Sequence, residues 1–77
     1  MANRTFESVI GRNLNRVLYD IGMTQAELAK AAGVSENAIS MMVKGKKVVS
    51  AEKLTAVEKI LGVTHEELTK DEKTVGK

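Results

Sequence analysis

Hydrophobic residues recur at intervals of three and four along residues 6–21, and this spacing is typical of an amphipathic helix with one buried face. Thr5 can cap the beginning of this helix and Gly22 can end it, so we expect a helix from Phe6 to Ile21. The residues expected to form its buried face are Phe6, Val9, Ile10, Leu14, Val17, Leu18 and Ile21.

A second helix is expected to begin at Gln25. Thr24 and Glu27 have the spacing of a capping box, in which each side chain accepts a hydrogen bond from the backbone of the other residue. Gly33 is expected to end this helix, because glycine adopts a left-handed backbone conformation without a Cβ clash. Ala29 lies one helical turn before Gly33, where a small side chain lets the following helix cross closely.

A third helix is expected over residues 36–44, with Ser35 as its cap and Gly45 as its end. Two short helices joined by a turn of about three residues that contains a glycine are the geometry of a helix-turn-helix. An ordinary helical hairpin can have a similar turn, but the small and apolar positions of this segment agree with the helix-turn-helix. The apolar contacts between its two helices are expected from Leu28, Ala32, Val34, Ile39 and Met42.

Two further helices are expected after a basic loop. Ser50 can cap a fourth helix that ends at Gly62, while Thr64 and Glu67 repeat the capping box and begin a fifth helix of one to two turns. No strand pattern competes with these helices. The expected inner face of the fourth helix consists of Leu54, Val57, Ile60 and Leu61.

The length of 77 residues allows one domain at most, and a chain of this size buries only about 60% of its unfolded surface. We expect an all-α domain over residues 1–69, with a frayed start up to Arg4 and a charged, mobile tail over residues 70–77. The N-terminus lacks the apolar run of a signal peptide, and no stretch approaches the length of a membrane span. A cytoplasmic protein without a membrane partner is therefore expected.

The side chains offer little for catalysis or metal binding. There is no cysteine, and the single histidine, His65, is expected to be a solvated residue in the first turn of the fifth helix. No nucleophile–histidine pair, glycine-rich phosphate loop or carboxylate cluster is present in the sequence. We therefore expect no enzyme activity, no metal and no cofactor.

The net charge of +2 and the isoelectric point near 9.0 permit nucleic-acid binding without arguing strongly for it. The charge is uneven, because residues 1–62 hold nine basic and six acidic side chains, whereas residues 63–77 hold three and four. A polyanion would therefore meet the body of the domain rather than its tail.

A resemblance to the Cro-like phage-repressor family of helix-turn-helix proteins is carried by three segments: MTQAELAKAAGVSENAIS, KGKK and ILGVTHEEL. The match extends over most of the chain, from about Leu14 to Leu68. It implies a compact five-helix bundle of the phage-repressor type, with the helix-turn-helix at the second and third helices. It also implies a small, sequence-specific transcriptional regulator of phage or bacterial type. This regulator would read a double-stranded DNA operator with the helix over residues 36–44, and a homodimer is a candidate assembly.

The resemblance also implies which residues contact DNA. Asn37 is suited to pair with adenine, Glu36 to accept a hydrogen bond from cytosine N4, and Met41 to touch a thymine methyl group. Gln25 would meet a phosphate at a helix N-terminus, and the lysines either follow the phosphates or belong to a solvated loop. The full candidate set is Gln25, Ser35, Glu36, Asn37, Ser40, Met41, Lys44, Lys46 and Lys47.

The chain departs from the family in its expected recognition helix. No basic residue lies between Ser35 and Val43, and Glu36 carries a negative charge that DNA phosphates repel. Leu18 and Val43 stand where many relatives pair an arginine with a glutamate, an exchange that apolar packing can accommodate. Methionine is adaptable at protein-binding surfaces, so Met41 also suits a protein partner. An alternative thus stays open: an antirepressor-like protein-binding module of the same fold that binds a second regulator protein and masks its DNA-binding surface.

Overall fold

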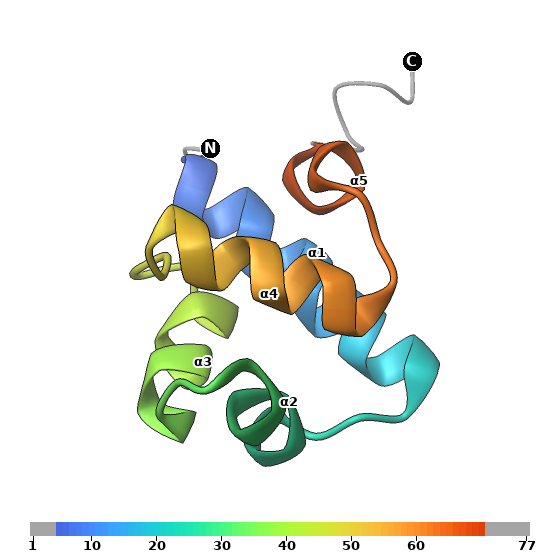
Figure 1. The fold of residues 1–77 in the computed structure, drawn as a ribbon. Helices are drawn as coiled ribbons and strands as arrows, with labels where there is room; N and C mark the ends of the chain where they lie inside the picture. Colours follow the sequence, from blue (N-terminus) through green and yellow to red (C-terminus); the bar gives the residue numbers. More distant parts are fainter. Residues whose placement is uncertain (1–4, 71–77) are drawn as a thin grey trace.

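The computed structural model describes residues 5–70, which form five α-helices and no strand (Figure 1). The all-α prediction is confirmed. The expected frayed start and almost all of the expected tail lie outside the described residues. The helices are α1 (Phe6–Ile21), α2 (Gln25–Ala32), α3 (Glu36–Val43), α4 (Ala51–Leu61) and α5 (His65–Thr69).

Side-chain caps set where the helices begin. The hydroxyl Oγ1 of Thr5 accepts a hydrogen bond from the backbone N–H of Ser8 at 3.1 Å, and α1 begins at the expected residue. Both expected capping boxes, at the beginnings of α2 and α5, are present. The end of α3 differs slightly from the prediction, because α3 ends at Val43 and Lys44 is its right-handed cap. Gly45, with φ of 75°, then turns the chain away.

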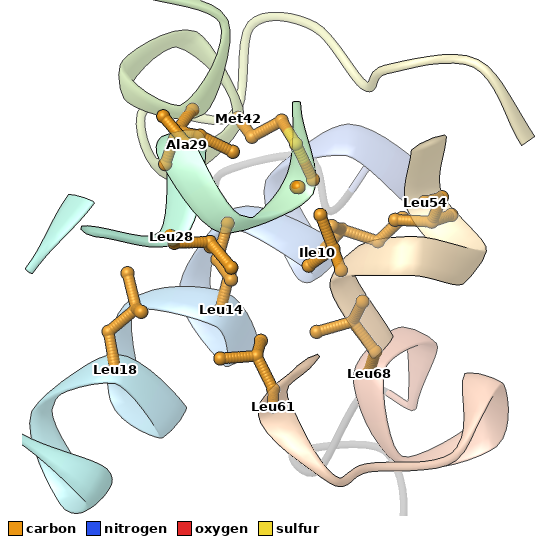
Figure 2. Close-up of a cluster of buried hydrophobic side chains, with 12 residues drawn as sticks. Ile10, Leu14, Leu18, Leu28, Ala29, Met42, Leu54, Leu61 and Leu68 are labelled. Carbon is orange, nitrogen blue, oxygen red and sulfur yellow. The ribbon is translucent and has the colours of Figure 1, made fainter. Parts of the chain in front are cut away.

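The five helices enclose one hydrophobic core. α1 packs against α3, α4 and α5, and α2 packs against α3 and α4. All five helices contribute side chains to this cluster, among them Leu14 of α1, Leu28 of α2 and Met42 of α3 (Figure 2). The core consists of Ile10, Leu14, Leu18, Leu28, Ala29, Ala32, Ile39, Met42, Leu54, Val57, Leu61 and Leu68.

The ends of α1 differ from the prediction. Phe6 and Ile21 were expected on the buried face, but they are 53% and 48% exposed. They are the first and last residues of the longest helix, so they extend past the shorter helices that cover its middle. Tyr19, which is not part of the apolar stripe, is 86% exposed. Half-buried Ile60 packs against the core from α4, whereas Glu58 on the same helix is buried.

Gly11 allows a close crossing of α1 and α3 that the hydrophobic pattern does not indicate. A Cβ atom at this position would lie 2.4 Å from the carbonyl oxygen of Met42 and 2.8 Å from that of Val43. These neighbours are backbone atoms, so no side-chain rearrangement can make room for the extra atom. A Cβ at Gly45 would likewise lie 3.0 Å from the Cα of Ser8. The end of α3 therefore rests directly on the first half of α1.

Two buried polar groups hold the C-terminal helices in place. The Asn13 side chain is buried in α1, and its Nδ2 donates to the carbonyl oxygens of Leu68 at 2.6 Å and Lys70 at 2.8 Å. Glu58 lies 2.6 Å from Nδ1 of His65, measured from its Oε2. His65 lies in the first turn of α5 with 64% of its side chain exposed, as expected, and its contact with Glu58 was not predicted. Both contacts join residues that are distant along the chain or on different helices.

Candidate nucleic-acid interface

The packing of α3 determines which of its sides can meet a ligand. Ile39 and Met42 are 0% and 1% exposed and contribute to the core, whereas Glu36 and Asn37 on the other side are exposed. α3 lies at the edge of the bundle, with its outer side turned away from the other helices (Figure 1). The helix-turn-helix thus presents one face of α3 to the outside, as the sequence predicts.

The candidate residues lie in two groups. Those on α3 and in the loop that follows it are brought close together in the fold, while Gln25 lies at the beginning of α2. Ser35, Glu36, Asn37, Lys44, Lys46 and Lys47 are exposed, and Gln25, Ser40 and Met41 are half-buried.

The beginning of α2 has the features of an anion site. The Thr24 backbone N–H donates to Oε1 of Glu27 at 2.9 Å, and the Glu27 N–H donates to Oγ1 of Thr24 at 3.0 Å. The backbone N–H groups of Gln25 and Ala26, in the first turn, have no acceptor within the helix. They point toward the N-terminal side of α2, where the helix dipole favours negative charge.

At the beginning of α3, one side chain caps the helix and the next two are exposed. Oγ of Ser35 accepts a hydrogen bond from the Ala38 N–H at 3.0 Å, so this hydroxyl caps the helix and keeps its proton for another partner. Glu36 lies in the first turn, where its negative charge complements the helix dipole. Among the described residues, neither Glu36 nor Asn37 forms a side-chain hydrogen bond or ion pair.

A groove of about 370 Å³ lies between α3 and the loop that connects it to α4. Its loop wall includes Val48 and Val49, which are half-buried and also pack against the core. The hydrophobic pattern did not assign Val48 or Val49 to a binding site. The groove is lined by Ser35, Asn37, Ala38, Met41, Lys47, Val48 and Val49.

Positive charge gathers beside this groove. Lys44, Lys46 and Lys47 follow α3 and are exposed, and none of them forms an ion pair within the described part of the chain. They outnumber Glu36, the one acidic residue of α3. A second groove, of about 520 Å³, is lined by two basic and two acidic side chains and two valines. Its balanced charge does not favour a polyanion, so the α3 side is the better candidate for nucleic acid.

Other kinds of site find no support in the described residues. No group of three or more histidine, cysteine or acidic side chains among them is placed to hold a metal ion. Within residues 5–70, no helix has the length and apolar character needed to cross a membrane.

Comparisons with known proteins agree with this geometry. A family model described as helix-turn-helix matches residues 20–68, which include α2, α3 and α4. The chain is similar to the clp gene regulator ClgR from Corynebacterium glutamicum, with 31% identity and a TM-score of 0.81. That similarity covers 87% of this chain and 71% of the regulator chain. A search of curated proteins found no match.

Two more solved structures share the arrangement of helices. The SOS-response transcriptional repressor LexA from Eubacterium rectale has 26% identity and a TM-score of 0.84, covering 95% of this chain and 78% of the repressor chain. The restriction-modification controller protein C.AhdI from Aeromonas hydrophila has 21% identity and a TM-score of 0.75. It covers 80% of this chain and 94% of its own, and at this identity the similarity shows the fold alone.

Proposed function

The chain belongs to the Cro/C1-type helix-turn-helix family and is a DNA-binding regulator, and from this premise we propose that α3 reads an operator of phage or bacterial type. The observation that carries the proposal is the contrast within α3. Its inner side is fixed by the core, while Glu36 and Asn37 on its outer side are exposed beside a loop with three lysines and have no side-chain partner within residues 5–70.

The proposed complex places α3 in the major groove. There Asn37 can pair with adenine through two hydrogen bonds, and Glu36 can accept one from cytosine N4. Ser35 and Ser40 lie at the borders of this contact and can donate hydrogen bonds to bases or phosphates. These groups need no rearrangement within the domain, because no described side chain occupies their hydrogen-bonding positions.

Contacts with the phosphate backbone of the DNA would fix the orientation of the domain on the duplex. Gln25 and the free amides beside it can bind a phosphate on one side of the groove, and the lysine loop can bind phosphates on the other. One recognition helix covers only a few base pairs, so we propose a symmetric dimer on half-sites about one helical turn apart.

The experiment that tests this proposal begins with selection of binding sites from random duplex DNA. The selected site is then titrated with the protein, and the stoichiometry shows whether two chains bind each operator. Asn37→Ala is expected to lose roughly 1–3 kcal/mol of discrimination at one base pair and little at the others. Asn15→Ala, at an exposed position of α1, is the matched control and should change neither affinity nor preference. A uniform loss across sequences with Asn37→Ala would mean that Asn37 does not read a base.

A second candidate function rests on the charge of α3 itself. α3 contains no basic residue, and its exposed carboxylate at Glu36 is unfavourable beside phosphates. An antirepressor of this fold would instead use α3 to bind a second regulator, with Glu36 paired to an arginine or lysine that the partner would otherwise present to DNA. Binding to a regulator encoded nearby, in the absence of sequence-specific DNA binding, would favour this alternative.

A further inference from the structure

The three methionines within residues 5–70 lie in different environments. Met42 is 1% exposed and belongs to the core, and half-buried Met23 packs against that core. Met41 is also half-buried, but it neither belongs to the core nor packs against it, and it lines the groove between α3 and the following loop. Among these three side chains, only Met41 therefore lies outside the core packing and beside an open groove.

A thioether that solvent can reach reacts with peroxides to form a sulfoxide. The sulfur attacks one oxygen of hydrogen peroxide and the O–O bond breaks. The second oxygen leaves as hydroxide, which takes the proton of the transferred oxygen and becomes water. The sulfur is oxidised and the peroxide is reduced, and methionine sulfoxide reductases reverse the change. The reaction converts a flexible apolar side chain into a polar one with a hydrogen-bond acceptor.

The groove offers partners for such an acceptor on only part of its lining. Val48 and Val49 line it with apolar groups, which cannot pair with a sulfoxide oxygen. Asn37, one helical turn before Met41, and Lys47 line the same groove with an amide and an ammonium group. Neither side chain has a hydrogen-bond or ion-pair partner within the described residues. A sulfoxide oxygen at Met41 can therefore accept hydrogen bonds from groups that the proposed complex uses for DNA.

We propose that Met41 is a peroxide-sensitive modification site, and that its oxidation to the sulfoxide weakens binding of α3 to the operator. This inference rests on the proposed function of α3. The sulfoxide oxygen competes with DNA for the donor groups of Asn37 and Lys47, so both affinity and base discrimination fall. Reduction of the sulfoxide restores them, and the regulator is thereby reversibly sensitive to peroxide.

The first measurement locates the oxidation. The full chain is treated with hydrogen peroxide, and mass spectrometry of proteolytic fragments follows the uptake of oxygen at each methionine over time. In the folded protein, Met41 is expected to react at least about tenfold faster than Met42, because the core keeps peroxide away from Met42. After unfolding in urea, the two methionines should react at similar rates.

The second measurement compares binding to the selected operator before and after peroxide treatment. Affinity is expected to fall about tenfold, which corresponds to the loss of one paired base contact. Discrimination at the base pair that Asn37 reads should fall with it, and treatment with methionine sulfoxide reductases and a thiol should restore both. The unfolding temperature of the oxidised protein should change little, because Met41 is not part of the core.

Two variants connect the loss of affinity to Met41. Met41→Leu removes the sulfur and keeps an apolar side chain, so the ratio of its affinities before and after treatment should stay near one. Met23→Leu is the matched control, because it removes a half-buried methionine that does not line the groove. Its affinity ratio should equal that of the unchanged protein. A loss that persists in Met41→Leu would assign the sensitivity to another residue and overturn the inference.

The remaining outcomes separate this inference from the proposed function. Sequence-specific binding that stays unchanged after Met41 is oxidised would overturn the inference alone. Equal reactivity of Met41 and Met42 in the folded chain would do the same. Absence of sequence-specific DNA binding by the untreated protein would overturn the proposed function and, with it, the effect of oxidation on DNA binding.

Discussion

The two faces of α3 differ in their surroundings: the inner face packs in the core, and the outer face is exposed. On the inner face, Ile39 and Met42 are surrounded by core side chains from the other helices. On the outer face, Glu36 and Asn37 contact no other side chain through a hydrogen bond or ion pair among the described residues. The comparison separates what the fold requires of this helix from what its ligand requires. The eight residues of α3 thus meet two separate requirements, core packing on one face and ligand binding on the other.

The largest expected change is a loss of folding stability, from a substitution where the inner face of α3 crosses α1. Gly11→Ala should lower the free energy of unfolding by about 3 kcal/mol, because its Cβ would meet the Met42 carbonyl oxygen at 2.4 Å. Gly22→Ala is the control, since no atom lies within 4 Å of that Cβ position. Left-handed strain alone should cost that variant about 1 kcal/mol. Urea denaturation measures both, and equal losses would show that the crossing is not tight.

A smaller loss of folding stability is expected from a substitution at the contact between α1 and the end of α5. Asn13→Ala removes the donor for the carbonyl oxygens of Leu68 and Lys70, which should cost about 2 kcal/mol. Hydrogen exchange should rise most in α5, because this contact ties it to α1. Unchanged exchange in α5, with a global loss of stability, would contradict this local role. The selected operator should still be recognised with the same base preferences, because the outer face of α3 is not touched.

Substitution of a residue that contacts phosphates should have a more modest effect on DNA affinity, and the salt dependence of binding measures it. Replacing Lys46 by glutamine should weaken DNA binding similarly across sequences and lower the salt slope by about 1 unit. Lys59→Gln, at an exposed position in the last turn of α4, should leave the slope unchanged. Titrations at several salt concentrations give both slopes. A change in base preference with Lys46→Gln would assign this lysine to base readout instead.

The smallest expected change is at Glu36, and its sign distinguishes the two candidate functions. With DNA, Glu36→Gln should leave binding equal or slightly stronger on most sequences, because one carboxylate beside phosphates is removed. With a protein partner, the same substitution should weaken the complex through loss of an ion pair. Glu52→Gln is the control, because it removes an acidic residue from the first turn of α4 in the same way. Isothermal titration against the operator and against the neighbouring regulator gives the sign in each case.

The elements of this fold could be predicted because the information that defines them is local. A helix cap and its partner lie within three residues, so Thr5, Thr24 and Ser35 indicated the beginnings of α1, α2 and α3 correctly. The burial of Phe6 and Ile21 was predicted wrongly, because periodicity does not show how far neighbouring helices reach.

Contacts between distant residues were not predictable in the same way. Gly11 lies within a helix, where glycine has no local reason to occur, and its role depends on α3 carbonyl groups that follow about thirty residues later. The hydrogen bonds of Asn13 join residues separated by more than fifty positions. In the candidate site, the residues of α3 followed from helical geometry, but the valine wall of the groove depends on the path of the loop, which no pattern specifies.

The contact between Gly11 and the end of α3 limits which substitutions such a sequence can accept during evolution. In the proposed complex Gly11 does not touch DNA, yet any side chain there would push the end of α3, and with it the lysine loop, away from α1. Gly45 is restricted in the same way by Ser8 of α1. Substitutions at the exposed positions of α3 can therefore change specificity without disturbing this contact, whereas the position of the end of α3 and of the lysine loop relative to α1 depends on the two glycines.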